Sequence, residues 1–458
     1  MAAILIKNGT VINHFGRQKA DVLIIGKKIA EIGSDIENVP EDSQIIDASG
    51  KLILPGGIDP HVHFHLKTPA GYSTDDFISG SKAALAGGTT TIIDFVTPNK
   101  NESLPVAYEM RLADAKGCLC DYGFHISPID FHKGLYQEMK QCVENIGIPS
   151  FKVYMAYKGS IGIDHETLEK TMVMAARLNA MVTIHAEEGD EISKLQQQYL
   201  ANGHVEPIYH ALSRPSSVET DAVRAAIALA KKTKAEVYFV HVSSPDSMKC
   251  IVDAQLEGFP IYAETCPQYL LLTIDKLKGS FEQAAPYVFS PALRDSNQRD
   301  VLWEYLKNGS IQTIGTDHCP FNLKGQKELG INDFTKIPNG AGGVEHRLEL
   351  MYTFGVLTGK ITLEQMVSML SFKPAQIFGI KNKGQITRGY DADVVIWNPV
   401  GERIISTATN WQQCDSNIYE GISVTGKVDS VFLRGELAYK DKSHGYVSGN
   451  YLKRELLG

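Results

Sequence analysis

The stretch Pro55-Gly-Gly-Ile-Asp-Pro-His-Val-His63 places two histidines two positions apart, at the end of an apolar run. In a β-strand, residues i and i+2 point to the same face. His61 and His63 are therefore presented side by side where a strand opens into a loop, as two imidazole ligands of one metal ion would be. A single His-X-His pair is a weak signal, so its meaning depends on the rest of the chain.

Outward from this stretch, apolar strand-like runs alternate with helical stretches, as in βα units around a parallel sheet. The runs are nearly all apolar, as expected of strands buried on both faces. Strands are predicted at 52–63, 89–96, 122–129, 150–156, 181–185, 236–242, 260–265 and 311–317, and helices at 73–85, 166–178, 217–231 and 298–307. Eight such units in about 270 residues predict a closed (β/α)8 TIM barrel. The alternative, an open doubly wound sheet, would need a glycine-rich fingerprint that Pro-Gly-Gly does not match.

Both ends of the chain have the short strands and turns that are typical of a small β domain. Strand-like runs are predicted at 3–11, 21–25, 28–32, 391–397 and 428–437. Turn signals accompany them at Asn8-Gly9 and Arg434-Gly435. We therefore expect a β-sandwich domain built from both termini, residues 1–52 and 385–458, beside a barrel of residues 53–384.

Composition narrows the class of protein. The 458 residues suffice for one large catalytic domain and a smaller one. The net charge of −8, without a basic stripe, argues against nucleic acid as a partner. No apolar stretch reaches membrane-spanning length, and the N-terminus lacks a basic leader and a cleavage site. We expect a cytoplasmic protein whose seven irregularly spaced cysteines are reduced thiols.

The ends of the predicted strands carry polar residues that can bind metal. Barrel enzymes place their chemistry at these C-terminal ends. After His61 and His63 on the first strand, His185 ends the fifth strand, His241 the sixth and Asp317 the eighth. One buried histidine is more often a satisfied core residue than a ligand. Four on three strands, with an aspartate, indicate a site for Zn²⁺ or a related ion.

Lys152 lies inside the apolar fourth strand, where a cation is costly unless it is paired. A bare ammonium would also be repelled by a nearby dication. Addition of carbon dioxide to the neutral amine would give an anionic carbamate that can bridge two metal ions. The alternative is that Lys152 points outward and extends between helices. The histidines and the aspartate on neighbouring strands favour the carbamate, which with Asp317 and a hydroxide leaves one net positive charge on two dications, suited to polarising a carbonyl.

At these residues the chain resembles the cyclic amidohydrolases, which include hydantoinase, dihydropyrimidinase, allantoinase and dihydroorotase. The likeness covers almost the whole length. Its motifs are Gly57-Ile-Asp-Pro-His-Val-His63, Ser150-Phe-Lys-Val-Tyr-Met-Ala-Tyr157, His185-Ala-Glu-Glu188, His241-Val-Ser-Ser244 and Gly315-Thr-Asp-His318.

The resemblance implies two divalent ions, Zn²⁺ or else Mn²⁺ or Co²⁺, and a homotetramer. It assigns His61, His63, Lys152 and Asp317 to one ion, and Lys152, His185 and His241 to the other. In this family, hydroxide bridges the ions, and the residue that matches Asp317 takes its proton and returns it to the leaving nitrogen.

Further motifs resemble those of hydantoinase and dihydropyrimidinase. By this resemblance Tyr157 stabilises the oxyanion, while Ser290 and Asn339 hold the amide edge of the ring through backbone groups. Dihydroorotase-like chains have Arg where this chain has His65, which argues against a carboxylated substrate. Allantoinase-like chains usually have Asn at that position and lack the Met-Ala-Tyr motif. The overall match is most similar to bacterial L-hydantoinase, which implies hydrolysis of 5-substituted hydantoins to N-carbamoyl amino acids.

The loop Phe64–Tyr72, including His65 and Leu66, is expected to form walls around the exocyclic substituent of the substrate, together with Phe95 and the loop after Tyr157. Dihydropyrimidinase and allantoinase activities remain alternatives. Another is a non-catalytic interaction protein similar to the collapsin response mediators, which have lost metal ligands. All six ligand positions are filled here, which favours the enzyme.

Overall fold

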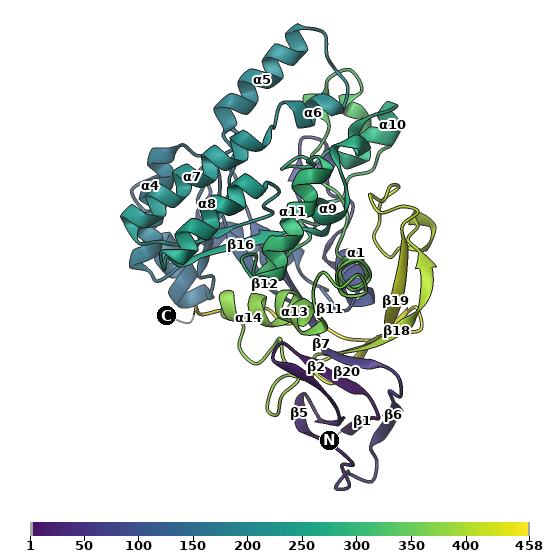
Figure 1. Cartoon of the computed structure of the whole chain (residues 1–458). Coiled ribbons are helices and arrows are strands. Elements are labelled where there is room, and N and C mark those ends of the chain that lie inside the picture. Colours follow the sequence, from purple (N-terminus) through teal and green to yellow (C-terminus); the bar gives the residue numbers. More distant parts are fainter. Residues whose placement is uncertain (1–2, 457–458) are drawn as a thin grey trace.

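The computed structural model describes residues 3–456. Eight parallel strands form its central sheet in the order β17-β16-β15-β14-β13-β12-β11-β8 (Figure 1). The two edges of this sheet meet, because the backbone N–H of Asp317 donates to the His61 carbonyl at 2.9 Å and that of His63 donates to the His318 carbonyl at 2.8 Å. The predicted barrel is confirmed. Its strands are β8 (Gly57–Val62), β11 (Thr89–Val96), β12 (Asp121–Ile126), β13 (Ser150–Tyr154), β14 (Met181–His185), β15 (Glu236–Phe239), β16 (Ile261–Thr265) and β17 (Thr313–Ile314).

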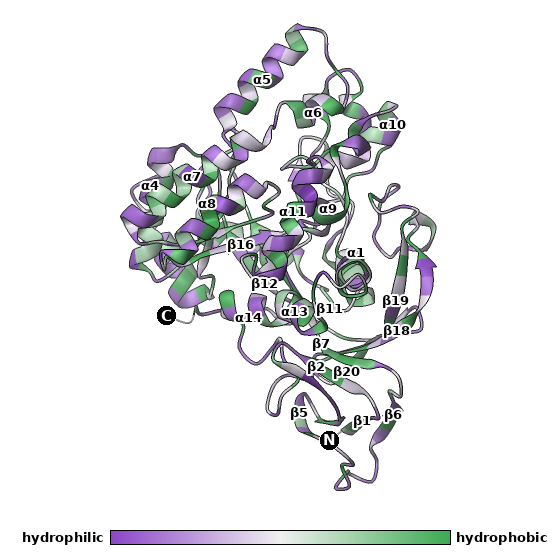
Figure 2. Cartoon of the chain, in the orientation of Figure 1, coloured by the Kyte–Doolittle hydropathy of each residue, from purple (hydrophilic) through white to green (hydrophobic). Residues whose placement is uncertain are grey.

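The helices cover the outside of the barrel, and those predicted at four positions correspond to α1, α4, α7 and α11. Aspartate caps three of them: Asp76 accepts the N–H groups of Ile78 and Ser79 in α1, Asp164 accepts that of Thr167 in α4, and Asp295 accepts that of Gln298 in α11. Figure 2 shows hydrophobic and hydrophilic stretches alternating along α4, α7 and α8, as expected of helices with one buried side. The helices are α1 (Phe77–Ala86), α2 (Leu104–Asp114), α3 (Leu135–Gln141), α4 (His165–Arg177), α5 (Gly189–Ala201), α6 (Ile208–Leu212), α7 (Ser216–Thr233), α8 (Pro245–Leu256), α9 (Pro267–Leu271), α10 (Phe281–Ala284), α11 (Ser296–Lys307), α12 (Arg347–Met351), α13 (Leu363–Val367) and α14 (Lys373–Ile377).

Two outer sheets form the predicted β-sandwich from both ends of the chain, with orders β5-β4-β1-β6 and β21-β20-β19-β18-β7-β2-β3. Buried apolar residues such as Ile6, Val22 and Phe432 join them in one core. Both predicted turns are present, with φ of 65° at Asn8 and 47° at Arg434. The strands are β1 (Ala3–Lys7), β2 (Thr10–Asn13), β3 (Gly16–Lys19), β4 (Asp21–Ile25), β5 (Lys28–Gly33), β6 (Gln44–Asp47), β7 (Leu52–Pro55), β18 (Val394–Ile404), β19 (Ser423–Leu433), β20 (Glu436–Lys440) and β21 (Ser443–His444).

The first predicted strand, 52–63, is two strands in different sheets. β7 pairs with β18 in the outer sheet, whereas β8 begins the barrel. Gly56 separates them, and a Cβ there would lie 2.1 Å from Thr90 Oγ1. The lack of a side chain therefore lets the chain pass from one sheet to the other at a tight crossing.

The C-terminal segment returns to the barrel, where the Asn450 carbonyl accepts the N–H of Tyr122 at 3.0 Å and buried Arg454 donates to Ser150 Oγ at 2.8 Å. None of the helices within residues 3–456 has the length and apolar character needed to cross a membrane.

Candidate metal centre and active site

The backbone changes direction sharply at the barrel mouth. His65, Tyr157, His241 and Asp317 have φ values of 49°, 61°, 40° and 52°. Such values are uncommon outside glycine, and they concentrate at functional sites where the surrounding structure holds them. Three of these residues follow barrel strands closely, so their side chains are presented at the ends of β13, β15 and β17.

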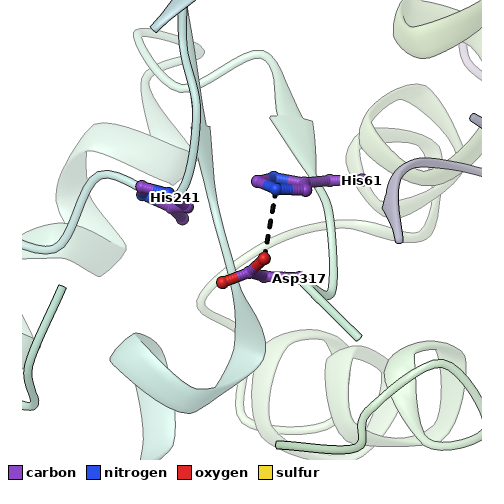
Figure 3. A group of neighbouring side chains, drawn as sticks. All are labelled: His61, His241 and Asp317. Atoms are coloured by element: carbon purple, nitrogen blue, oxygen red, sulfur yellow. Dashed lines mark ion pairs between the residues drawn. The ribbon is translucent and has the colours of Figure 1, made fainter. Parts of the chain in front are cut away.

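His61, His63 and Asp317 converge on one point. The Nε2 atoms of His61 and His63 lie 3.2 Å apart. Asp317 Oδ1 lies 3.1 Å from the first and 3.2 Å from the second. Two nitrogens bound tetrahedrally to Zn²⁺ at 2.0–2.1 Å would be about 3.3 Å apart. The spacing of the two imidazoles therefore suits a common metal ion. Figure 3 shows His61 and Asp317 facing each other, with His241 beside them.

His185 and His241 form a second pair. Nδ1 of His185 lies 3.0 Å from Nε2 of His241. On its other side, His185 Nε2 lies 2.8 Å from the carboxylate of Glu187. Because an ionised carboxylate only accepts, Nε2 carries the hydrogen in neutral His185 and Nδ1 offers a lone pair. The buried Nδ1 of His241 has no partner among the described residues. One ring nitrogen of His241 also lies in a group with ligand atoms of His61 and Asp317, all within 4.8 Å of one another.

Lys152 is directed into the barrel. Its side chain is 1% exposed, and its Nζ lies 5.0 Å from the ring centres of Phe95 and Tyr154. Phe95 also stacks on His63, with ring centres 4.5 Å apart. The alternative that Lys152 extends between outer helices is therefore wrong. Burial lowers the pKa of Lys152 to about 7, which favours the neutral amine that carbon dioxide requires.

Sequence reasoning did not single out Glu264, which supports both histidine pairs. Glu264 is fully buried at the end of β16. Its Oε1 lies 2.7 Å from His61 Nδ1 and accepts the backbone N–H of His241 at 3.0 Å. Tyr238 donates its hydroxyl to Oε2 at 2.8 Å. The sequence signal for this residue was a carboxylate inside the apolar run 260–265. Burial alone would lower the pKa of His61, but the carboxylates of Glu264 and Asp317 raise it to about 9. A metal ion must therefore displace a proton there.

Glu187 supports the second pair in the same way. It is fully buried between His185 and Arg214, whose Nη1 lies 2.7 Å from its Oε2. Burial alone would raise the pKa of Glu187, but Arg214 and His185 lower it to about 2. Carboxylate–histidine pairs of this kind orient metal ligands and raise their basicity. The neighbouring Glu188 instead faces His165, at 3.1 Å, near the surface.

Tyr157, Ser290 and Asn339 come together beside the second histidine pair. Asn339 Nδ2 donates to Ser290 Oγ at 3.1 Å. Burial raises the pKa of Tyr157, and the nearby side chains of Ser290 and Asn339 lower it in part. The Tyr157 ring centre lies 5.2 Å from that of His185. A phenol that keeps its proton can therefore donate a hydrogen bond close to the candidate metal centre.

The residues expected to line the substituent pocket lie in different surroundings. His65 stacks on Tyr72, with ring centres 4.2 Å apart, and Leu66 donates its N–H to Ser73 in the hairpin of β9 (Lys67–Thr68) and β10 (Gly71–Tyr72). Phe95 is only 2% exposed. Its ring lies against those of His61, His63 and His125. The Phe95 ring therefore supports these histidines, and its place in the wall of the substituent pocket stays a prediction.

Comparisons with known proteins define the family. Residues 52–438 match the family described as "Amidohydrolase family". D-hydantoinase from Geobacillus stearothermophilus is 44% identical, over 99% of this chain and 97% of that protein. The crystal structure of dihydropyrimidinase from Brevibacillus agri NCHU1002 superposes with a TM-score of 0.97 at 45% identity, over 100% of this chain and 99% of that one. The chain belongs to the amidohydrolase family, and its relatives include hydantoinases and dihydropyrimidinases.

The comparisons correct one detail of the expected resemblance. The L-hydantoinase from Arthrobacter aurescens has a TM-score of 0.90 and 29% identity, over 98% of this chain and 99% of that one. The D-hydantoinase from Geobacillus stearothermophilus, at 44% identity, is more similar. The expectation that bacterial L-hydantoinase is the nearest relative is therefore wrong.

Membership of this family implies a binuclear centre of divalent metal ions with a carbamylated lysine, and the residues of this chain fit such a centre. Asp317 contacts one histidine pair and lies in a group with His241 of the other, and each pair is backed by a buried carboxylate. Lys152 forms no hydrogen bond or ion pair with the rest of residues 3–456, although it is buried with these ligands. A carbamate between two cations would give this side chain the partners it lacks.

Proposed function

We propose that this protein hydrolyses the ring amide bond of 5-substituted hydantoins to give N-carbamoyl amino acids. The observation that carries the proposal is the filled set of six ligand positions next to the cluster of Tyr157, Ser290 and Asn339. Relatives named D-hydantoinase and dihydropyrimidinase support hydrolysis of a cyclic amide. Dihydropyrimidinase and allantoinase activities are the alternatives within the family.

Two sets of residues would hold the metal ions, which we propose are Zn²⁺, with Mn²⁺ or Co²⁺ as substitutes. His61, His63, Asp317 and carboxylated Lys152 would hold one ion. Lys152, His185 and His241 would hold the other. When bound, such ions supply a nucleophilic hydroxide at neutral pH and polarise the amide carbonyl.

Asp317 is proposed to move the proton during hydrolysis. Its Oδ1 faces His61 and His63, which leaves Oδ2 to take a proton from the nucleophile and deliver it to the ring nitrogen that leaves. Burial raises its pKa, but His61 and His63 hold the pKa of Asp317 well below its usual range. The carboxylate is therefore ionised, which leaves its oxygens free to act as acceptors.

Tyr157, Ser290 and Asn339 are proposed to hold the ring. Tyr157 donates its hydroxyl to the oxygen on which negative charge develops, an interaction that strengthens in the transition state. Ser290 and Asn339 use backbone groups to hold the amide edge. This arrangement is common to rings with different substituents, so the loop Phe64–Tyr72 is the proposed source of discrimination between them.

We also propose the division into residues 1–52 with 385–458 and residues 53–384, a homotetramer and a cytoplasmic location. The placement of β7 in the outer sheet and β8 in the barrel supports a division close to the first of these boundaries. The proposed chemistry uses residues of one chain and does not depend on the homotetramer or on the cytoplasmic location.

A hydrolysis panel tests the proposed function. The metal-loaded protein is assayed with both enantiomers of 5-benzylhydantoin and with dihydrouracil, allantoin and dihydroorotate. We expect the highest kcat/KM with a benzylhydantoin. Faster turnover of dihydrouracil or allantoin would assign the alternative activity, and metal-loaded protein that cleaves none of these rings would refute the proposal. Metal analysis separates a non-catalytic relative, which would bind less than two ions per chain.

A further inference from the structure

Lys327 is a buried lysine outside the metal centre. It begins the turn Lys327–Gly330 and is 1% exposed. Its Nζ lies 3.0 Å from each of three backbone carbonyls, those of Val288, Pro338 and Gly340. An ammonium has three donors, so each donor has one acceptor. No carboxylate in the described part of the chain forms an ion pair with it.

The three carbonyls belong to the two loops that carry Ser290 and Asn339. Val288 lies two residues before Ser290, and Pro338 and Gly340 lie on either side of Asn339. The loops also meet directly, because the Gly340 N–H donates to the Val288 carbonyl at 3.1 Å. Lys327 therefore joins the two loops at the positions that flank their proposed substrate contacts.

The Asn339 loop has little freedom to adjust to a change at this junction. Gly340 has a φ of 144°, and a Cβ there would lie 2.2 Å from the carbonyl oxygen of Cys319. Cys319 lies two residues after Asp317, and its N–H donates to the Ala341 carbonyl at 2.9 Å. The loop is thus confined between Lys327 on one side and the strand end that carries Asp317 on the other.

Packing alone does not explain a lysine at this position. A buried cation without a counter-charge is costly unless hydrogen bonds compensate it, whereas methionine has similar length and no charge. A methionine would fill the space but would leave three buried carbonyls without their donor. What lysine adds is the convergence of three hydrogen bonds from two separate loops on one atom.

We propose that Lys327 is a positioning residue that fixes the separation of the Ser290 and Asn339 loops and so sets the affinity of the site for the amide edge of the ring. This inference rests on the proposed function, because it assumes that these loops hold the substrate. Lys327 acts through the loops and does not touch the reacting atoms.

The test compares Lys327→Met with Lys324→Met, which removes an exposed lysine from the same segment. Steady-state kinetics use the panel substrate with the highest wild-type kcat/KM, so a different ring preference leaves the test intact. Metal content and the melting temperature are measured on the same samples. We expect Lys327→Met to keep its metals and to raise KM at least about tenfold, with a smaller fall in kcat, because the ring is held less well while the metal ligands are untouched.

The control and a second variant complete the test. Lys324→Met should match the wild type in KM and kcat. Lys327→Arg keeps the charge and several donors, and should recover part of the lost affinity. If Lys327→Met does not fold, Lys327→Gln replaces it, since its amide can serve at most two of the three carbonyls. A folded variant with a lower melting temperature but wild-type KM would overturn the proposal, as would a loss explained by missing metal.

Discussion

Glu264→Gln is the most informative substitution at the metal centre. The carboxylate holds Nδ1 of His61 and the backbone N–H of His241, so it supports one ligand from each histidine pair. Glutamine has the same shape, which matters because a Cβ on Gly315 would lie only 2.6 Å from Glu264 Oε2. The amide oxygen can remain with His61 and His241, and the amide nitrogen can face Tyr238. The substitution thus removes the charge and keeps the packing.

The expected effect is a weaker metal centre in a folded protein. A neutral acceptor raises the basicity of His61 less than a carboxylate does, and loss of such a partner typically costs 10–100-fold in metal affinity. That range corresponds to about 1.4–2.7 kcal/mol. Because the same oxygen also holds the backbone of His241, we expect the occupancy of both metal positions to fall.

The assay is titration of the metal-depleted protein with Zn²⁺, followed by activity and by metal analysis. Glu257→Gln is the control, since Glu257 pairs with Lys231 at the surface, away from the site. Activity of Glu264→Gln should return at high Zn²⁺, which would separate weaker binding from misfolding. Wild-type affinity and wild-type turnover in Glu264→Gln would refute the idea that this carboxylate supports the metal ligands.

Three further predictions address the lysine, the oxyanion and the stability of the fold. Lys152→Ala should be inactive and poor in metal by elemental analysis, with partial recovery by added small carboxylates; full activity would exclude the carbamate. Tyr157→Phe should lower kcat about 10²-fold in steady-state assays, whereas a rise in KM alone would make Tyr157 a group that only positions substrate. Burial, with Arg214 nearby, lowers the pKa of His210 from 6.5 to about 3, so the unfolded chain binds the additional proton between these values. The contribution of His210 to the free energy of unfolding should be complete above pH 6.5. It should fall by roughly 1.4 kcal/mol for each pH unit as the pH decreases from 6.5 to 3. His210→Gln, which can still donate to the Phe289 carbonyl, should lose less stability on acidification in denaturant titrations, and an equal loss would contradict this assignment.

The cluster of candidate metal ligands could be predicted because its position depends on a rule of geometry. In a parallel barrel the C-terminal strand ends meet at one mouth, so polar residues at those ends must lie together once the strands are recognised. His61, His185, His241 and Asp317 follow this rule and converge in the structure. The barrel itself followed from the alternation of apolar and helical runs.

The supporting residues could not be predicted in the same way, because their roles depend on partners far away in the sequence. Glu264 lies 203 positions from His61, which it orients. Lys327 acts on carbonyls, which are present in every residue and leave no mark in the sequence. The contacts of Phe95 with His61 and His63 join two neighbouring strands, and its place in one apolar run does not indicate them.

The residues with positive φ at the barrel mouth connect the candidate ligands with the residues that support them. Glycine would adopt this backbone conformation at no steric cost, whereas other residues lose roughly 1–2 kcal/mol each. Yet glycine has no imidazole, carboxylate or phenol, so the chemistry requires larger residues at these positions. Hydrogen bonds hold two of them: the His241 N–H donates to Glu264 and the Asp317 N–H to the His61 carbonyl. Glu264 thus fixes the ring of His61 and the strained backbone of His241 together, and the geometry of the metal centre depends on a residue that is not itself a ligand.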